Sequence, residues 1–479
     1  MKLIISILFF APIIVFAQLK AFPTAEGYGK FATGGRGGDV YHVINLNNDG
    51  AGSLRYGIER QDNYYGPRTI VFDVGGDIKL THMIRAGNRL DHTLNYQYDD
   101  LTIAGETAPF PGITITSLNT DSGDGGALIN LQSKNIIVRY LTFRVNDNNA
   151  SSLDALQIVN PFIDDYISEN IIIDHLSISN GSDENFSIQG VNKTTIQNCM
   201  IGNGDNKGYN VLFGYKTYKV TFYRNLLHHS AARNPIVGYG QWSSSMEFIN
   251  NLVFGYETTS FNISYGNYVD GVGNVFKAWN DDDPNLNSIR WARNSYNNPD
   301  GVPTDGAIYF ADNFQENPEK HGLALYNSDA ITYNQNSRVL TNSFILDWKK
   351  TISTIENDVL NSGLGVGNSL HRDNFDAVAV SDYTNGSNKR ELDSFIVNKS
   401  PTARSASFDT DGDGMADSWE LSEFGDLSQD NNGIYNASGN TNLEAYLFSL
   451  VGELADVVTQ PINTYAEIKA IQSTFTGLN

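Results

Sequence analysis

The sequence predicts an all-β fold, a right-handed parallel β-helix, followed by a small and mostly helical C-terminal segment. Three observations support this prediction: short β-branched apolar runs recur, no long helical periodicity separates them, and an asparagine follows each later run. These asparagines are Asn198, Asn225, Asn251 and Asn274, which are 27, 26 and 23 residues apart. A repeat of this length indicates a solenoid, because one unit cannot bury its apolar face without stacked neighbours.

The elements follow in order along the chain. Residues 52–58 predict a short helix, and residues 345–360 show a second helical pattern. The predicted strand runs are 68–74, 101–105, 113–116, 136–138, 171–173, 194–196, 220–222, 246–249 and 307–311. Adjacent coils of such a solenoid stack about 4.8 Å apart. We therefore expect the asparagines at one corner to form a hydrogen-bonded ladder.

The N-terminal residues 1–17 read as a signal peptide. A lysine at position 2 precedes an apolar run from Leu3 to Phe16. A membrane anchor would need about 20 apolar residues, whereas this run is shorter and contains Pro12. We therefore expect a secreted or periplasmic protein without a membrane span after cleavage.

Composition restricts the class of partner. The formal net charge is −22, and removing Lys2 with the signal gives −22 − 1 = −23. Nucleic acid is excluded as a partner, because phosphate binding needs a basic surface. An acidic polysaccharide fits only if metal ions carry the contact. Cys199 is the one cysteine, so no intramolecular disulfide can form, and its apolar surroundings predict a buried structural thiol.

Charged residues attached to the apolar runs form the first candidate site. They comprise three carboxylates, a lysine and an arginine, namely Asp154, Asp183, Glu184, Lys207 and Arg233. Because the repeat stacks these runs, we predict a metal and anion site along one face of the coil. Asp183 and Glu184 would face opposite ways on a strand, so only one would bind metal unless the loop bends. The alternatives are that Asp154 caps a turn and that Lys207 is solvated.

A second candidate metal site lies near the C-terminus, in residues 409–420. Glycines at 412 and 414 separate oxygen-bearing residues at loop positions 1, 3, 5, 9 and 12, with a main-chain carbonyl at position 7. This is the spacing of an EF-hand-like calcium loop. The predicted calcium ligands are Asp409, Asp411, Asp413, Met415, Asp417 and Glu420. The alternative is a solvated acidic turn.

These patterns predict four parts of the chain. Residues 1–17 are the signal peptide, and residues 18–400 form the β-helix domain with an N-terminal cap and a C-terminal helical cap. Residues 401–450 form the calcium-binding segment, and residues 451–479 form a tail with no assignable chemistry. The glycine-rich stretch from Ala21 to Gly38 is expected to cap the end of the core.

The chain resembles the secreted pectate lyases of polysaccharide lyase family 1, in the form common in Bacteroidetes. The calcium loop is a frequent companion in such chains. The matching pieces are Ala21 to Gly38, Gly52 to Arg55, Ile173 to His175, Ser182 to Asn185, the Lys207 segment and Ala232 to Pro235. The resemblance implies a right-handed parallel β-helix and calcium-assisted β-elimination on polygalacturonate or a related uronan. We expect a monomer.

By the family pattern, Asp154, Asp183 and Glu184 would bind Ca²⁺, Lys207 would hold a substrate carboxylate, and Arg233 would be the base. Neutralising that carboxylate acidifies the proton on the adjoining carbon. Nearby positive charge would disfavour the charged form of the arginine, which predicts an alkaline optimum. Calcium would also bridge an acidic cleft to a polyanion.

One departure from the family pattern concerns substrate binding. Many pectate lyases carry further arginines beyond the catalytic one, whereas Ile236, Val237 and Gly238 follow Pro235 here. Arg224 could replace them, or the substrate could be another uronate or esterified pectin. Two alternative functions remain. The missing arginines favour a non-catalytic uronan-binding β-helix, and the motif at 119–121 suggests a polygalacturonase-type hydrolase. Asp174 and His175 are expected to be structural, with a packed and hydrogen-bonded histidine.

Overall fold

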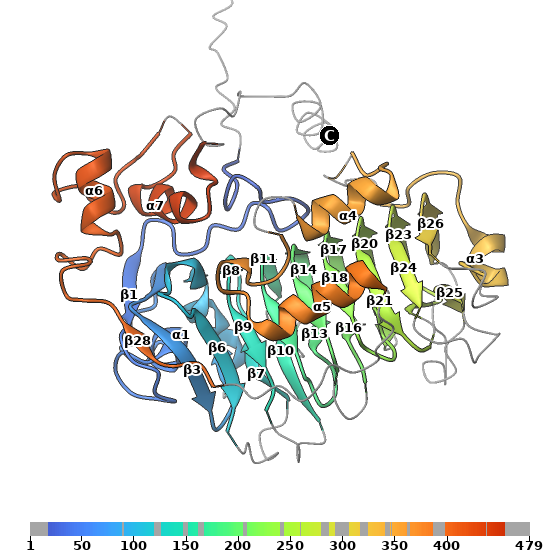
Figure 1. Cartoon of the computed structure of the whole chain (residues 1–479), viewed down its shortest axis with the longest axis horizontal. Helices are drawn as coiled ribbons and strands as arrows, with labels where there is room; N and C mark the ends of the chain where they lie inside the picture. The colour runs from blue at the N-terminus through green and yellow to red at the C-terminus, as the bar shows by residue number, and fades with distance from the viewer. Residues whose placement is uncertain are drawn as a thin grey trace, which may run out of the picture.

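The strands wind into a parallel β-helix in which, from the second coil onward, each strand pairs with the strand three places earlier in the chain (Figure 1). The computed structural model describes residues 18–455, except 89–90, 119–125, 147–151, 161–166, 205–207, 240–243, 259, 279–286, 293–305, 317–323, 341–344, 346, 362–364, 387–397 and 437. The signal peptide and Lys207 lie outside the described residues. Each complete coil contributes one strand to each of three sheets, so the predicted all-β parallel β-helix is confirmed.

The three sheets are numbered by their order in the first coils. Sheet 1 contains β1 (Asp39–Val43), β2 (Arg68–Phe72), β5 (Leu101–Ala104), β8 (Ile136–Arg139), β11 (Ser168–Asp174), β14 (Val191–Gln197), β17 (Thr217–Tyr223), β20 (Ser245–Ile249), β23 (Tyr268–Val272) and β26 (Ala307–Ala311). Sheet 2 contains β3 (Val74–Leu80), β6 (Ile113–Ser117), β9 (Thr142–Arg144), β12 (Ser177–Ser179), β15 (Met200–Gly202), β18 (Leu226–His228), β21 (Leu252–Tyr256), β24 (Val275–Ala278), β27 (Phe314–Gln315) and the antiparallel edge strand β28 (Thr402–Ala403). Sheet 3 contains β4 (Ile84–Ala86), β7 (Gly126–Leu131), β10 (Leu153–Val159), β13 (Phe186–Gln189), β16 (Val211–Gly214), β19 (Ile236–Tyr239), β22 (Phe261–Ser264) and β25 (Ile289–Ala292).

Helices lie outside the coil. The described helices are α1 (Leu54–Ile58), α3 (Ser328–Tyr333), α4 (Ile352–Leu360), α5 (Asn374–Asn385), α6 (Asp417–Glu423), α7 (Asn442–Leu450), η1 (His92–Tyr98), η2 (Gly105–Thr107) and η5 (Ser369–His371). None in the described part of the chain is long and apolar enough to cross a membrane. The helix α1 confirms the one expected at 52–58.

From β8 onward, each coil turns after sheet 1 through a residue in the left-handed conformation. His175, Asn198, Arg224 and Asn250 occupy this corner with φ between 51° and 55°, and Gly273 follows with φ 67°. In the strands between corners, side chains point alternately inward and outward. Residues such as Ile171 and Ile173 therefore point into the interior and are completely buried. The stacked apolar rows form one continuous core along the whole coil.

An asparagine ladder lies inside the turn that follows this corner. The side-chain oxygen of Asn225 accepts from the Cys199 N–H at 2.8 Å, Asn251 accepts from Asn225 at 2.9 Å, and Asn274 accepts from Asn251 at 2.9 Å. The placement of Asn198 in this ladder was wrong by one residue. Asn198 forms the left-handed corner itself, while Cys199 takes the ladder position and is completely buried. The expected buried thiol is confirmed.

The three sheets are covered differently (Figure 1). Helices α4 and α5 pack apolar side chains on the outer face of sheet 2, where Phe375 of α5 shares one apolar cluster with Met200 and Leu226. Sheet 3 meets α1 at its first strand and α3 at its last strand. In the described part of the chain, the middle strands of sheet 3 therefore present the open face.

Sheet 1 is covered by the glycine-rich segment. This segment crosses the strands rather than capping the end of the coil: the N–H groups of Tyr28, Gly29 and Gly35 bind side-chain oxygens of β17, β14 and β5 at 3.1, 2.8 and 2.9 Å. A Cβ on Gly29 would lie 2.1 Å from the carbonyl oxygen of Ile171. Glycine is therefore required because the backbone lies flat on the sheet.

Candidate active site and calcium sites

The first candidate site is a row of side chains at the N-terminal ends of the strands of sheet 3. In the parallel register Leu156 pairs with Phe186, and Phe186 pairs with Val211. Residues two positions earlier, Asp154, Glu184 and Tyr209, therefore lie next to one another on successive coils. Arg233 comes next, because Tyr209 pairs with the preceding residue, Ala232.

A bent loop brings Asp183 and Glu184 to the same place. Ser182 fixes the loop to β10: its hydroxyl accepts from the Leu153 N–H at 2.8 Å, and its own N–H donates to the Leu153 carbonyl at 2.8 Å. At the bend, a Cβ on Gly181 would lie 2.0 Å from the carbonyl oxygen of Glu184. The loop therefore departs from strand geometry, and the expectation of opposite faces does not apply.

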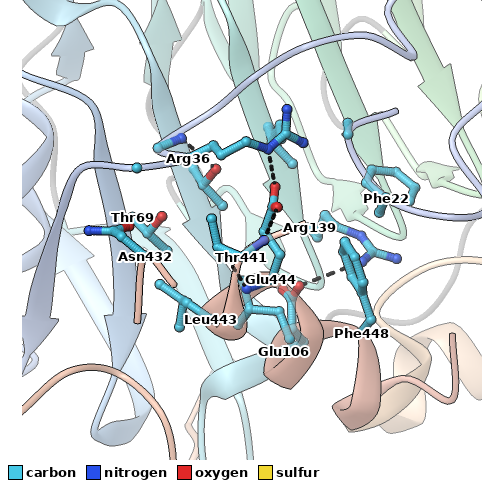
Figure 2. A pocket seen from close by; sticks show the side chains of 16 residues that line it. Phe22, Arg36, Thr69, Glu106, Arg139, Asn432, Thr441, Leu443, Glu444 and Phe448 are labelled. Carbon is cyan, nitrogen blue, oxygen red and sulfur yellow. Dashed lines mark hydrogen bonds and ion pairs between the residues drawn. The ribbon is translucent and has the colours of Figure 1, made fainter. Parts of the chain in front are cut away.

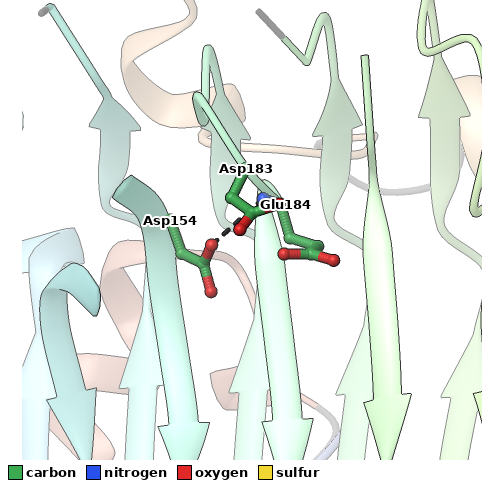
Figure 3. Close-up of side chains that lie close together, drawn as sticks. All are labelled: Asp154, Asp183 and Glu184. Atoms are coloured by element: carbon green, nitrogen blue, oxygen red, sulfur yellow. Dashed lines mark hydrogen bonds between the residues drawn. The ribbon is translucent and has the colours of Figure 1, made fainter. Parts of the chain in front are cut away.

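Asp154, Asp183 and Glu184 form a compact oxygen cluster (Figure 3). Each offers a carboxylate oxygen, and these oxygens lie within 4.8 Å of one another. The carboxylate of Asp154 accepts from the Glu184 N–H and from Gln157, both at 3.0 Å. Asp154 and Glu184 are each only 4% exposed. Carboxylates crowded in this way suit a hard cation such as Ca²⁺, which takes oxygen ligands.

Arg233 completes the row. Its guanidinium forms an ion pair with Glu184 and stacks 3.7 Å above the ring centroid of Tyr209. The side chain of Arg233 is 22% exposed, so it is reachable from solvent. Sequence reasoning missed Tyr209, since an aromatic residue in a β-rich chain carries no signal until the register is known.

A second amide ladder lies directly beneath this row. Asn185, Asn210 and Asn234 each follow a row residue, and Asn185 donates to Asn210 at 3.0 Å while Asn210 donates to Asn234 at 2.7 Å. All three asparagines are at most 1% exposed. Because each is one residue from the row, the ladder fixes the relative positions of Glu184, Tyr209 and Arg233. The recurrence of asparagine at intervals of 25 and 24 residues was the available sequence signal.

Asp174 and His175 lie away from the row, at the corner after sheet 1. His175 Nδ1 lies 2.8 Å from the Asp174 carboxylate, and its ring stacks on Tyr140 with centroids 4.7 Å apart. Burial would raise the pKa of Asp174, but His175 and Arg139 hold it well below its ordinary value. The predicted packed, hydrogen-bonded histidine is confirmed.

Arg224 also lies away from the row. It occupies the corner after sheet 1 and pairs with Asp358 of α4 at 3.1 Å. The residues after Pro235 enter strand β19, where Val237 is completely buried. The structure therefore does not bring Arg224 to the place of the missing arginines.

The C-terminal loop forms the second oxygen cluster. Carboxylate oxygens of Asp409, Asp411 and Asp417 lie within 4.8 Å of one another, as do those of Asp411, Asp413 and Glu420. Glu420 is completely buried, yet neither of its carboxylate oxygens has a hydrogen-bond partner. Burial and the neighbouring carboxylates raise the pKa of Glu420 to about 7. A buried carboxylate without a partner is costly, so this donor set fits a bound cation.

A cavity separate from both clusters lies between sheet 1 and α7 (Figure 2). It is lined by the glycine-rich segment, buried strand residues and α7, and the Arg36 to Glu444 ion pair crosses it at 2.6 Å. Its charged groups are already paired with one another. The cavity is therefore part of the contact between α7 and sheet 1, and not a substrate cleft.

A "Probable pectate lyase C" from Emericella nidulans is 30% identical over 449 residues, which cover 91% of this chain and 94% of that protein. A protein of the same name from Neosartorya fischeri is 30% identical over 454 residues, covering 90% and 94%. The chain belongs to the pectate lyase family. Within the pectate lyase family, the match to the Aspergillus flavus relative is 35% over 260 residues and spans about half of each protein, 54% and 53%.

These relatives are fungal, so the Bacteroidetes form of the family stays a prediction. A scan against models of known protein families found no match. Among solved structures, Jun a 1, the major allergen from cedar pollen, aligns with a TM-score of 0.44 and 18% identity, covering 67% of this chain and 86% of that one. Pectate lyase II from Xanthomonas campestris aligns with a TM-score of 0.42 and 13% identity, covering 73% and 99%.

Proposed function

We propose that this chain is a secreted polysaccharide lyase that cleaves pectate or a related uronan by calcium-assisted β-elimination. The observation that carries the proposal is the single row in which Arg233 stands next to a cluster of three carboxylates. This reaction needs a base that removes a proton and a group of oxygen ligands that holds a cation, and the row can supply both. The names of the relatives point the same way.

The reaction begins at the carbon next to a substrate carboxylate. Calcium held by Asp154, Asp183 and Glu184 would supply charge neutralisation of that carboxylate and thereby acidify the neighbouring proton. Arg233 in its uncharged form accepts this proton and becomes the guanidinium. The electron pair forms a carbon–carbon double bond, the glycosidic carbon–oxygen bond breaks, and the leaving oxygen takes a proton from water. Lys207 stays a prediction as a second group that binds the substrate carboxylate.

Tyr209 and the buried amides position the base. The ring of Tyr209 lies under one face of the Arg233 guanidinium, which excludes water from that face and limits its orientation. Asn234, the next residue, is fixed by Asn210 from the neighbouring coil. The base is thus held by packing from the side and by hydrogen bonds from beneath, as positioning of a reacting group requires.

The other parts of the proposal concern the rest of the chain. Residues 1–17 direct export, residues 18–400 carry the lyase site, and residues 401–450 form an EF-hand-like segment that binds a second calcium ion. The ligands of this ion are Asp409, Asp411, Asp413, the Met415 carbonyl, Asp417 and Glu420. The completely buried, unpartnered carboxylate of Glu420 supports this assignment.

One observation favours a second candidate, a non-catalytic uronan-binding β-helix. The residues after Pro235 form an apolar strand, so the arginines that many family members carry there are missing. The motif behind the hydrolase alternative, at 119–121, lies outside the described residues.

A product assay separates the candidates. The purified protein is incubated with polygalacturonate and calcium chloride at alkaline pH, and the near-ultraviolet absorbance of the unsaturated product is followed. We expect absorbance to rise, and to stop rising when a chelator is added. Cleavage without the chromophore would indicate hydrolysis, and binding without cleavage would indicate the non-catalytic candidate.

A further inference from the structure

The C-terminal calcium segment is built into the side of the β-helix. Met415, at position 7 of the loop, is completely buried in an apolar cluster that joins Leu443 and Leu447 of α7 to Ala104 of β5. Val40 of β1 packs on the same cluster. Residues from the first coils and from the C-terminal segment, such as Ala104 and Met415, therefore share one small core, and the segment is not a separate module.

Ion pairs and hydrogen bonds fasten the same contact (Figure 2). Arg36 of the glycine-rich segment pairs with Glu444 of α7 at 2.6 Å, and Asn432 donates to the Gly38 carbonyl at 3.0 Å. Past the end of α7, Glu453 pairs with the buried Arg139 of β8 at 2.6 Å. These contacts place the glycine-rich segment between sheet 1 and the C-terminal segment.

The loop itself touches the first strand through His42. One ring nitrogen, Nε2, lies 3.2 Å from the Gly412 carbonyl and 3.8 Å from the Asp409 carboxylate. The other, Nδ1, lies 2.9 Å from the carboxylate of Asp73, between β2 and β3. His42 therefore connects a proposed calcium-binding loop directly to the first coil.

The loop shape depends on compensating its own charge. Five carboxylates lie in twelve residues, and that of Glu420 is buried without a hydrogen bond. A cation between them removes their repulsion and draws Glu420 of α6 onto the loop. The same closure holds Met415 in its buried position.

We infer that calcium in the C-terminal loop acts as a clasp that fastens both ends of the described chain onto the outer face of sheet 1. Residues 20–43 contribute no ligand, yet their attachment depends on the ion. This inference rests on the proposed calcium loop and is independent of the lyase activity. Its chemical basis is that Met415 contributes to both contacts. Its carbonyl would bind the ion, and its side chain packs in the apolar cluster between the C-terminal segment and the β-helix.

Amide hydrogen exchange of the full chain tests the clasp. Exchange of peptides covering residues 26–43 is measured in calcium chloride and in a calcium chelator, with magnesium chloride as a second comparison. Ligand binding stabilises the closed state in proportion to its excess over Kd. At free calcium about 100 times Kd we expect these amides to exchange up to about 100-fold more slowly than in chelator.

Three variants assign the effect. Glu420→Gln keeps the size of the side chain but removes a ligand, so calcium should no longer protect residues 26–43. Met415→Ala keeps every oxygen ligand but loses the packing, so calcium should protect residues 409–420 and no longer protect residues 26–43. Glu184→Gln alters the other cluster, so protection of residues 26–43 should stay as in the parent chain.

The inference is overturned if calcium protects residues 409–420 of the parent chain but leaves residues 26–43 unchanged. It is also overturned if Glu184→Gln, and not Glu420→Gln, removes the protection of residues 26–43. The product assay reports separately on the lyase proposal, so a protein without lyase activity can still show the clasp.

Discussion

The two carboxylate clusters differ in how their charge is balanced. In the row on sheet 3, Arg233 lies beside the carboxylates and Asp154 accepts two hydrogen bonds. In the C-terminal loop, Glu420 is buried with no hydrogen-bond partner. A cation in the loop would therefore mainly stabilise the structure. A cation in the row would share its site with an arginine that can take part in chemistry.

The clusters also differ in how the chain assembles them. The loop ligands lie within twelve consecutive residues, so local turns with Gly412 and Gly414 at positive φ are sufficient. The row gathers Asp154, Glu184 and Arg233 from different coils, so its geometry depends on strand register. Changes in the row should therefore affect turnover, whereas changes in the loop should affect stability.

Replacing the base should have the largest effect on activity. Arg233→Ala removes the proton acceptor, and we expect kcat to fall by about 10²- to 10⁴-fold without loss of the folded state. Initial rates of unsaturated-product formation and a thermal unfolding curve check both parts. Arg224→Ala is the matched control, because Arg224 pairs with α4 away from the row, and it should stay within about twofold. Substantial residual turnover in Arg233→Ala would reject the base assignment.

A matched glutamine substitution in each cluster should give the next largest effect, on the unfolding temperature for one cluster and on turnover for the other. Because Glu420→Gln weakens the clasp, we expect the calcium-dependent rise in Tm to shrink by roughly 5 °C. Glu184→Gln should retain most of that rise and lose turnover. Calorimetric unfolding in calcium and in chelator measures the first, and the product assay measures the second. If the two variants behave alike, the separation between a structural and a reactive cation fails.

Removing the ring under the base should have the smallest effect of the three. Tyr209→Leu loses the stacking on Arg233, and a cation–π contact of about 0.5 to 2 kcal/mol corresponds to a loss in kcat of about 2- to 30-fold. Tyr209→Phe keeps the ring and should retain activity within about twofold. We expect KM to change little in either variant. A loss confined to KM, or an equal loss in both variants, would contradict a positioning role.

The repeat made much of the fold predictable. Short apolar runs at regular intervals identify stacked coils, and charged residues at their edges identify the face on which Asp154, Glu184 and Arg233 come together. The calcium loop was equally visible because its ligands follow one local spacing, and its carboxylates do cluster in space. Whether either cluster holds calcium is still a prediction.

Exact register and long-range contacts could not be predicted. Asn198 and Cys199 are neighbours, and only the left-handed corner decides which of them enters the ladder. Tyr209 has no distinctive spacing, because its role comes from lying between Glu184 and Arg233. The tail from residue 451 was given no chemistry, yet Glu453 pairs with the buried Arg139. An isolated glutamate carries no sequence signal for such a distant partner.

The glycine-rich segment has a consequence for the order in which the chain folds. Tyr28 binds an oxygen of Thr221, a residue 193 positions later, and the cover over this segment comes from α7 still further along the chain. Contacts of such separation form late, because the intervening chain must first be ordered. A segment close to the start of the chain is thus among the last to pack, because the surface that it binds forms only after much later residues have been synthesised.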